Sequence, residues 1–135
     1  MRMNDFKDSG VLITGGTAGL GLGLAWAVAN AGANVAVTAR HRPAPGDMPS
    51  AAHFVKSDIA DESDVYRVAA EAQHLLGHVS VLVNNASTLG DIPLRLLLDT
   101  DSETLSDVIE TNVMGPSVSP RLFCRVCCSK KTASS

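Results

Sequence analysis

Three glycines follow a short apolar run near the beginning of the chain, in the order Gly15-x-x-x-Gly19-x-Gly21. The apolar run at 11–14 predicts a buried strand, and the Leu- and Ala-rich segment 20–30 predicts a helix. Glycines between a strand and a helix let phosphate oxygens approach the backbone, and the helix N-terminus supplies free N–H groups. We therefore predict a phosphate-binding loop, with a glycine-rich turn that binds nothing as the alternative.

The elements around this loop alternate between strands and helices. Strands are predicted at 11–14, 34–38, 53–56 and 79–83, and helices at 20–30 and from the capping residue Asp61 to Gly77. A further helix follows the capping-box pattern Thr100 to Glu103, and its apolar stripe is Leu105, Val108, Ile109, Asn112 and Val113. This alternation predicts an α/β fold with a Rossmann-type parallel sheet of about four strands, in the order 3-2-1-4 and flanked by helices.

We expect this Rossmann unit to cover residues 1–116 and to be incomplete at one edge, where strand 79–83 would be exposed. Residues 117–135 contain five serines, one proline and three cysteines without a sustained period. We predict that they form an unpatterned C-terminal tail.

Several further motifs appear in order along the chain. Asn84-Asn85-Ala86-Ser87 follows the fourth predicted strand, Asp58 follows the third, and Thr111-Asn112-Val113-x-Gly115-Pro116 ends the last predicted helix. Together with the glycine loop, these motifs resemble the short-chain dehydrogenase/reductase family over about residues 10–116. Gly19 preceded by Ala18 favours the shorter subfamily over the extended sugar-nucleotide enzymes.

The resemblance implies a nicotinamide dinucleotide cofactor and hydride transfer between a carbonyl and an alcohol. It assigns Asp58 to the adenine ring and Asn112 to a water in the proton relay. A local bond near the helix end is the alternative role for Asn112. The cofactor contacts that the resemblance implies are Thr14, Gly15, Thr17, Gly19, Leu20, Gly21, Asp58, Ile59, Asn85 and Ala86.

The residues that end the second strand bear on the choice of cofactor. An acidic side chain there would bind the ribose hydroxyls of NAD and repel the 2′-phosphate of NADP. The residue at this position is Ala39, and it is followed by Arg40, whose guanidinium can form two parallel bonds to a phosphate. We therefore expect NADP(H) rather than NAD(H), with a solvated loop charge as the alternative reading of Arg40.

The catalytic residues of the resembled family are a serine, a tyrosine and a lysine, with the last two spaced as Tyr-x-x-x-Lys. Tyr66 is the one tyrosine of the chain, position 70 is Ala70, and Tyr66 precedes the Asn84 motif. We therefore expect this chain to be inactive alone, after a frameshift or truncation near Gly115. A non-enzymatic nucleotide-binding or regulatory module and a non-functional product are the alternatives.

Composition excludes other classes of function. The net charge of −3 argues against nucleic acid, and no apolar run predicts a signal peptide or a membrane span. We expect a cytoplasmic protein without a metal site, because the four histidines lack ligand spacing and Cys124-x-x-Cys127 stands in the predicted tail. The resemblance implies that complete relatives form homo-oligomers.

Overall fold

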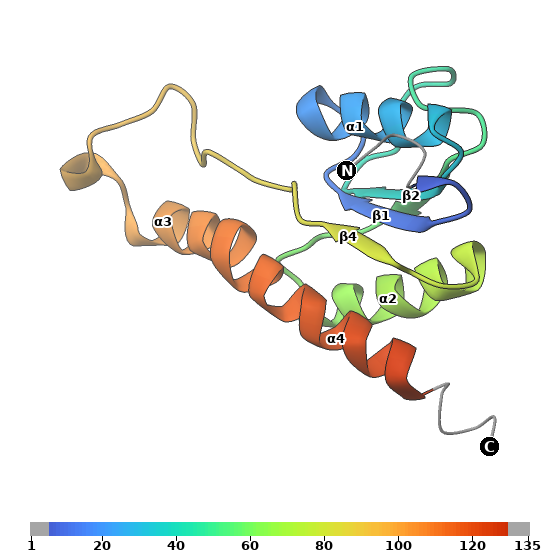
Figure 1. Cartoon of the computed structure of the whole chain (residues 1–135). Coiled ribbons are helices and arrows are strands. Elements are labelled where there is room, and N and C mark those ends of the chain that lie inside the picture. The colour runs from blue at the N-terminus through green and yellow to red at the C-terminus, as the bar shows by residue number, and fades with distance from the viewer. Residues whose placement is uncertain (1–5, 130–135) are drawn as a thin grey trace.

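The computed structural model describes residues 6–129, and within them four strands form one parallel sheet (Figure 1). The strand order is β3-β2-β1-β4, which confirms the predicted fold class. β4 is an edge strand, as expected, and is shorter than the predicted run 79–83. The strands are β1 (Gly10–Thr14), β2 (Asn34–Ala39), β3 (His53–Lys56) and β4 (Val81–Val83).

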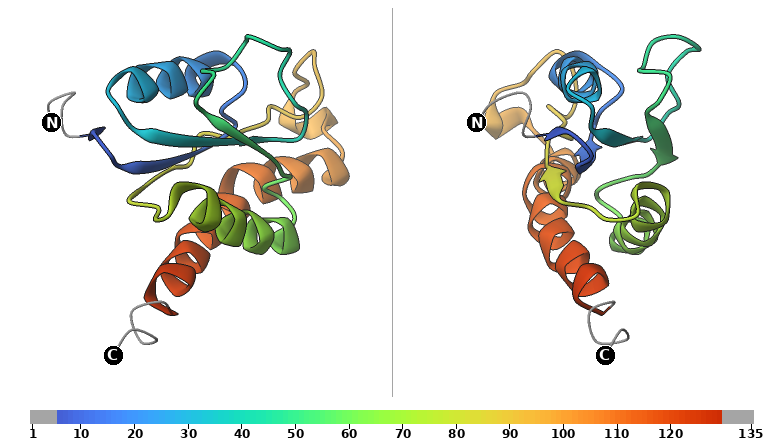
Figure 2. Two further views of the ribbon diagram at one scale, coloured as in Figure 1. Left: turned by 90° about the vertical axis from the view of Figure 1, so that its right-hand side faces the viewer. Right: turned by 45° about the vertical axis from the view of Figure 1, so that its right-hand side comes forward.

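Helices cover both faces of this sheet (Figure 2). α1 (Gly19–Asn30) packs on one face, where Val11 and Ile13 of β1 join Val28 in one core cluster. α2 (Glu62–Leu76) and α4 (Gly115–Ser129) cover the other face, where Leu12 points. Side chains of a strand alternate between faces, so a single five-residue strand contributes to both halves of the core.

The ends of α1 and α2 follow the sequence signals. Asp61 caps α2, because its carboxylate accepts the N–H groups of Ser63 and Asp64 at 2.9 and 3.4 Å. Gly77 and Gly32 follow α2 and α1 with φ of 75° and 88°, the left-handed conformation that favours glycine. The predicted cap at Asp61 and the predicted helix end at Gly77 are confirmed.

The predicted cap at Thr100 is wrong. Asp101 caps α3 (Ser102–Ile109), and its carboxylate accepts the N–H of Thr104 at 2.7 Å. The Thr100 hydroxyl instead donates to the Leu96 carbonyl, beside the short 3₁₀ turn η2 (Leu97–Asp99).

The prediction that residues 117–135 lack regular structure fails for the described part, because α3 continues through a π-helical turn, η3 (Glu110–Met114), into α4. One face of α4 presents Gly115, Ser119 and Phe123 at intervals of four residues, and all three are buried. A Cβ on Gly115 would lie 2.6 Å from the Ile59 carbonyl oxygen, so glycine allows the close approach of α4 to that loop. The Ser119 hydroxyl donates to the Gly115 carbonyl at 2.9 Å, inside a helix that also contains Pro120.

The apolar stripe of the helix predicted after Thr100 does not pack into the core, which is where such a stripe normally lies. Leu105, Ile109 and Val113 are 40%, 45% and 57% exposed. The reason is placement, since α3 lies beside and beyond the β4 edge rather than over the sheet (Figure 1).

Among the described residues, no helix combines the length and the apolar character needed to cross a bilayer.

Candidate functional site

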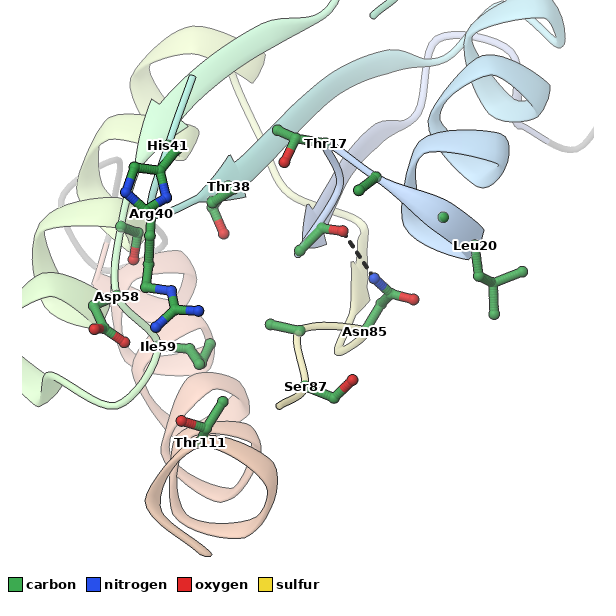
Figure 3. Close-up of a pocket in the computed structure, with 16 residues that line it drawn as sticks. Thr17, Leu20, Thr38, Arg40, His41, Asp58, Ile59, Asn85, Ser87 and Thr111 are labelled. Carbon is green, nitrogen blue, oxygen red and sulfur yellow. Dashed lines mark hydrogen bonds between the residues drawn. The ribbon is translucent and has the colours of Figure 1, made fainter. Parts of the chain in front are cut away.

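A pocket of about 600 Å³ opens at the carboxyl ends of the strands (Figure 3). The loops after β1, β2, β3 and β4 all contribute to its wall. In open parallel sheets, ligands bind at this edge where the strand order reverses, which here lies between β1 and β4. The predicted residues that line it are Gly15, Thr17, Gly19, Leu20, Arg40, Asp58, Ile59, Asn85 and Ala86.

Thr14 and Asn85 join the ends of β1 and β4. The Thr14 hydroxyl accepts the N–H groups of Asn85 and Ala86 at 3.0 and 3.1 Å and donates to the Val83 carbonyl at 3.4 Å. The Asn85 amide Nδ2 donates to the carbonyls of Thr14 and Gly15 at 3.1 and 3.0 Å. We call these five bonds the Thr14–Asn85 clasp. Thr14 does not line the pocket, so its part in the site is to hold the loops that do.

The clasp explains two of the three glycines. A Cβ on Gly15 would lie 2.7 Å from the Ala86 Cα, and one on Gly21 would collide with the Asn85 amide and the Gly15 carbonyl. Gly21 is therefore packed beneath the loop and does not line the pocket. Gly19 differs, because its φ is 52° and nothing lies within 4 Å of the Cβ position. The loop is closed against β4 and open toward the pocket.

The N-terminus of α1 opens into the same pocket. Ala18 is the N-cap residue and provides no capping side chain, and the first turn contains no acidic residue. The first N–H groups of a helix lack intrahelical partners and stand at the positive end of the helix dipole. The loop glycines add no side-chain bulk, and the first N–H groups of α1 have no capping side chain. Together with the volume of the pocket, these features fit the phosphates of a nucleotide.

The other end of the pocket is formed where β2 and β3 end. Ala39, Arg40 and His41 follow one another there, and Asp58 and Ile59 come from the loop after β3. The Asp58 N–H donates to the Asp64 carboxylate at 2.9 Å, which ties this loop to the first turn of α2. The hydrogen bond from the Asp58 N–H is the main cause of a lowered pKa of Asp64, and the hydrogen bond from Arg67 is the second cause.

Asn112 is exposed on η3 and does not line the pocket. Its amide binds the backbone of Thr88 in both directions: the carbonyl oxygen Oδ1 accepts the Thr88 N–H, and Nδ2 donates to the Thr88 carbonyl, both at 2.8 Å. The polar side chain on the apolar stripe therefore has a distant partner rather than a local bond near the helix end. Its place in a proton relay stays a prediction.

Some lining residues were not predicted to belong to the site. Thr38 is the second-last residue of β2 and Ser57 directly follows β3, so their places at the strand ends were an available signal. His41, one of the four histidines without ligand spacing, is exposed and also lines the pocket. Thr111 reaches the pocket from η3, which no local pattern indicates. The side chain of Cys127 lies outside the described residues, so the Cys124-x-x-Cys127 spacing is not tested.

Comparisons with known proteins agree with this geometry. The model of the short chain dehydrogenase family matches residues 9–132. This chain belongs to the short-chain dehydrogenase family. It is 32% identical over 125 residues to the uncharacterized oxidoreductase YxnA of Bacillus subtilis, covering 86% of this chain and 34% of YxnA.

Solved structures share the fold. A short-chain dehydrogenase from Streptomyces avermitilis matches with a TM-score of 0.76 and 31% identity, over 87% of this chain and 44% of that one. The NADH-dependent reductase A1-R′ complexed with NAD matches with a TM-score of 0.82 and 24% identity, over 99% of this chain and 58% of that one. In each comparison this chain spans less than two thirds of the relative's own length.

The clasp predicts a specific effect of removing one hydroxyl. Thr14→Val keeps the shape of the side chain but leaves the N–H groups of Asn85 and Ala86 without their acceptor. We expect the free energy of unfolding to fall by about 1–3 kcal/mol, measured by urea denaturation. Thr38→Val is the matched control, because Thr38 pairs with Thr14 in the sheet and its hydroxyl makes no hydrogen bond to any described residue. Equal losses in the two variants would contradict the clasp.

The lowered pKa of Asp64 predicts how its stabilising effect depends on pH. A lowered folded-state pKa means that the stabilisation is complete above the unfolded value of about 3.9 and is lost as the pH falls through the folded value. Wild type should therefore exceed Asp64→Asn in unfolding free energy by about 1 kcal/mol at pH 6. The difference should shrink below pH 4.

The exposed Asp107 on α3 provides the control for this titration. Asp107→Asn should leave the unfolding free energy close to wild type across the same pH range. An Asp64→Asn difference that persists unchanged at low pH would show that the charge of Asp64 is not what holds the Asp58 loop.

Proposed function

We propose that this chain binds NADP(H) in preference to NAD(H) in the pocket at the carboxyl ends of β1 to β4. The observation that carries the preference is the end of β2, where the neutral Ala39 and the cationic Arg40 both line the pocket. A carboxylate at this position would repel a 2′-phosphate, and none is present there. The family match supports a dinucleotide cofactor without distinguishing the two forms.

The two ends of the pocket would hold different parts of the cofactor. Gly15, Gly19 and the N-terminus of α1 would hold the pyrophosphate, because they combine open space with uncapped N–H groups. Ala39, Arg40, Asp58 and Ile59 would hold the adenosine end. When bound, the nicotinamide supplies the hydride donor or acceptor of a carbonyl–alcohol interconversion.

We further propose that these 135 residues bind the cofactor without turning over a substrate. Tyr66 is the one tyrosine in the sequence, it lies on α2 before the Asn84 motif, and Ala70 stands where a Tyr-x-x-x-Lys pattern would need lysine. Proton transfer needs a donor within hydrogen-bond reach of the substrate, and Tyr66 does not line the pocket. We therefore do not assign the substrate class or the catalytic activity of the longer relatives to these residues alone.

Arg40→Ser tests the cofactor preference. Wild type should bind NADPH at least tenfold more tightly than NADH, measured by isothermal titration calorimetry. Loss of a charge-assisted contact should weaken NADPH binding roughly tenfold to a hundredfold and leave NADH binding within about twofold.

Arg95→Ser is the matched control, because Arg95 lines a separate small cavity and does not line this pocket. It should change neither affinity by more than about twofold. Tighter binding of NADH than of NADPH by wild type would refute the proposal.

A further inference from the structure

The segment between β2 and β3, residues 40–52, begins with three consecutive basic residues. The structure gives these three side chains different surroundings. Arg40 and His41 line the pocket, and Figure 3 shows the His41 ring next to Arg40 at the end of β2. Arg42 instead stacks on Phe54 of β3, with 4.8 Å between its guanidinium carbon and the ring centroid. Two of the three basic side chains are therefore available to a ligand in the pocket.

The segment is held from two sides. The Arg42–Phe54 contact fastens its beginning to β3, and the Trp26 indole N–H donates to the Asp47 carbonyl at 3.3 Å, which fastens its middle to α1. The His41 imidazole forms no hydrogen bond to any described residue, so its ring nitrogens remain available. A donor on a held segment loses less conformational entropy when it binds a ligand.

The charges that line the pocket include one that would repel a phosphate. Among the lining residues, the ionisable side chains are Arg40, His41 and Asp58. The Asp58 carboxylate shares this end of the pocket with Arg40, and its Oδ1 accepts one N–H, that of Ala60, at 3.1 Å. A 2′-phosphate would therefore meet a guanidinium and a carboxylate of opposite charge, and the remaining favourable group is His41.

We propose that His41 is a second specificity-determining residue, which donates an imidazole N–H to the 2′-phosphate beside Arg40. This inference rests on the proposed preference for NADP(H). An imidazole has at least one N–H donor in either protonation state, and a second donor offsets the unfavourable Asp58 charge. Arg40 and His41 then form a two-residue contact for the phosphate, while Arg42 holds the segment in place.

The direct test compares two ligands that differ only in the 2′-phosphate, adenosine 2′,5′-bisphosphate and adenosine 5′-monophosphate. His41→Phe keeps a ring of similar shape but removes both nitrogens. It should weaken binding of the bisphosphate roughly fivefold to tenfold and leave binding of the monophosphate unchanged, as measured by calorimetry on the full chain. His41→Lys, which restores a cationic donor, should retain most of the wild-type preference.

His53→Phe is the matched control, because His53 is exposed at the start of β3 and does not line the pocket. It should change neither affinity. Equal weakening of both ligands by His41→Phe would overturn the inference, since it would place His41 against the adenosine rather than the phosphate.

Failure of this inference can be told apart from failure of the proposed function. If wild type prefers the bisphosphate and Arg40→Ser abolishes that preference while His41→Phe does not, the His41 inference is overturned and the NADP(H) proposal stands. If wild type binds the two ligands equally, both are overturned.

Discussion

The Thr14–Asn85 clasp is the interaction on which the site depends. β1 and β4 are far apart in the sequence, and their loops leave the sheet at the point where the strand order reverses. One hydroxyl and one amide tie those loops together through five bonds. The clasp brings Ala86 and the Asn85 amide so close to the glycine loop that positions 15 and 21 have no room for a Cβ. The same closure directs the open side of the loop, at Gly19, toward the pocket.

The two ends of the pocket differ in the origin of their favourable charge. At the α1 end the charge comes from backbone N–H groups and the helix dipole, which any dinucleotide pyrophosphate can use. At the β2–β3 end the favourable charge comes from side chains. It depends on the balance between the basic Arg40 and His41 and the acidic Asp58. Binding of a dinucleotide is therefore built into the fold, whereas the choice between its two forms depends on a few side chains on one loop.

Features that depend on neighbouring residues could be predicted from the sequence. The glycine loop, the Asp61 cap and the strand order follow from periodicity and from the limited topologies of parallel sheets. Most predicted cofactor residues gather at one pocket because they lie in the loops that follow the strands or at the N-terminus of α1. Features set by distant contacts could not be predicted, and Asn112 illustrates this, since its partner is the backbone of Thr88, 24 residues earlier. α4 is a second case, because its buried Gly115 and Ser119 do not form an apolar stripe and Pro120 argues against a helix.

Amide NMR of the full chain during titration with NADPH tests whether the clasped glycine loop holds the cofactor's phosphates. We predict that the N–H signals of Gly15, Gly19 and Ala86 shift and saturate together. The N–H signals of Leu94 and Arg95, which line a separate small cavity beside α3, should stay in place. Saturation of NADPH binding with no shift at the three loop positions would contradict this account of the site.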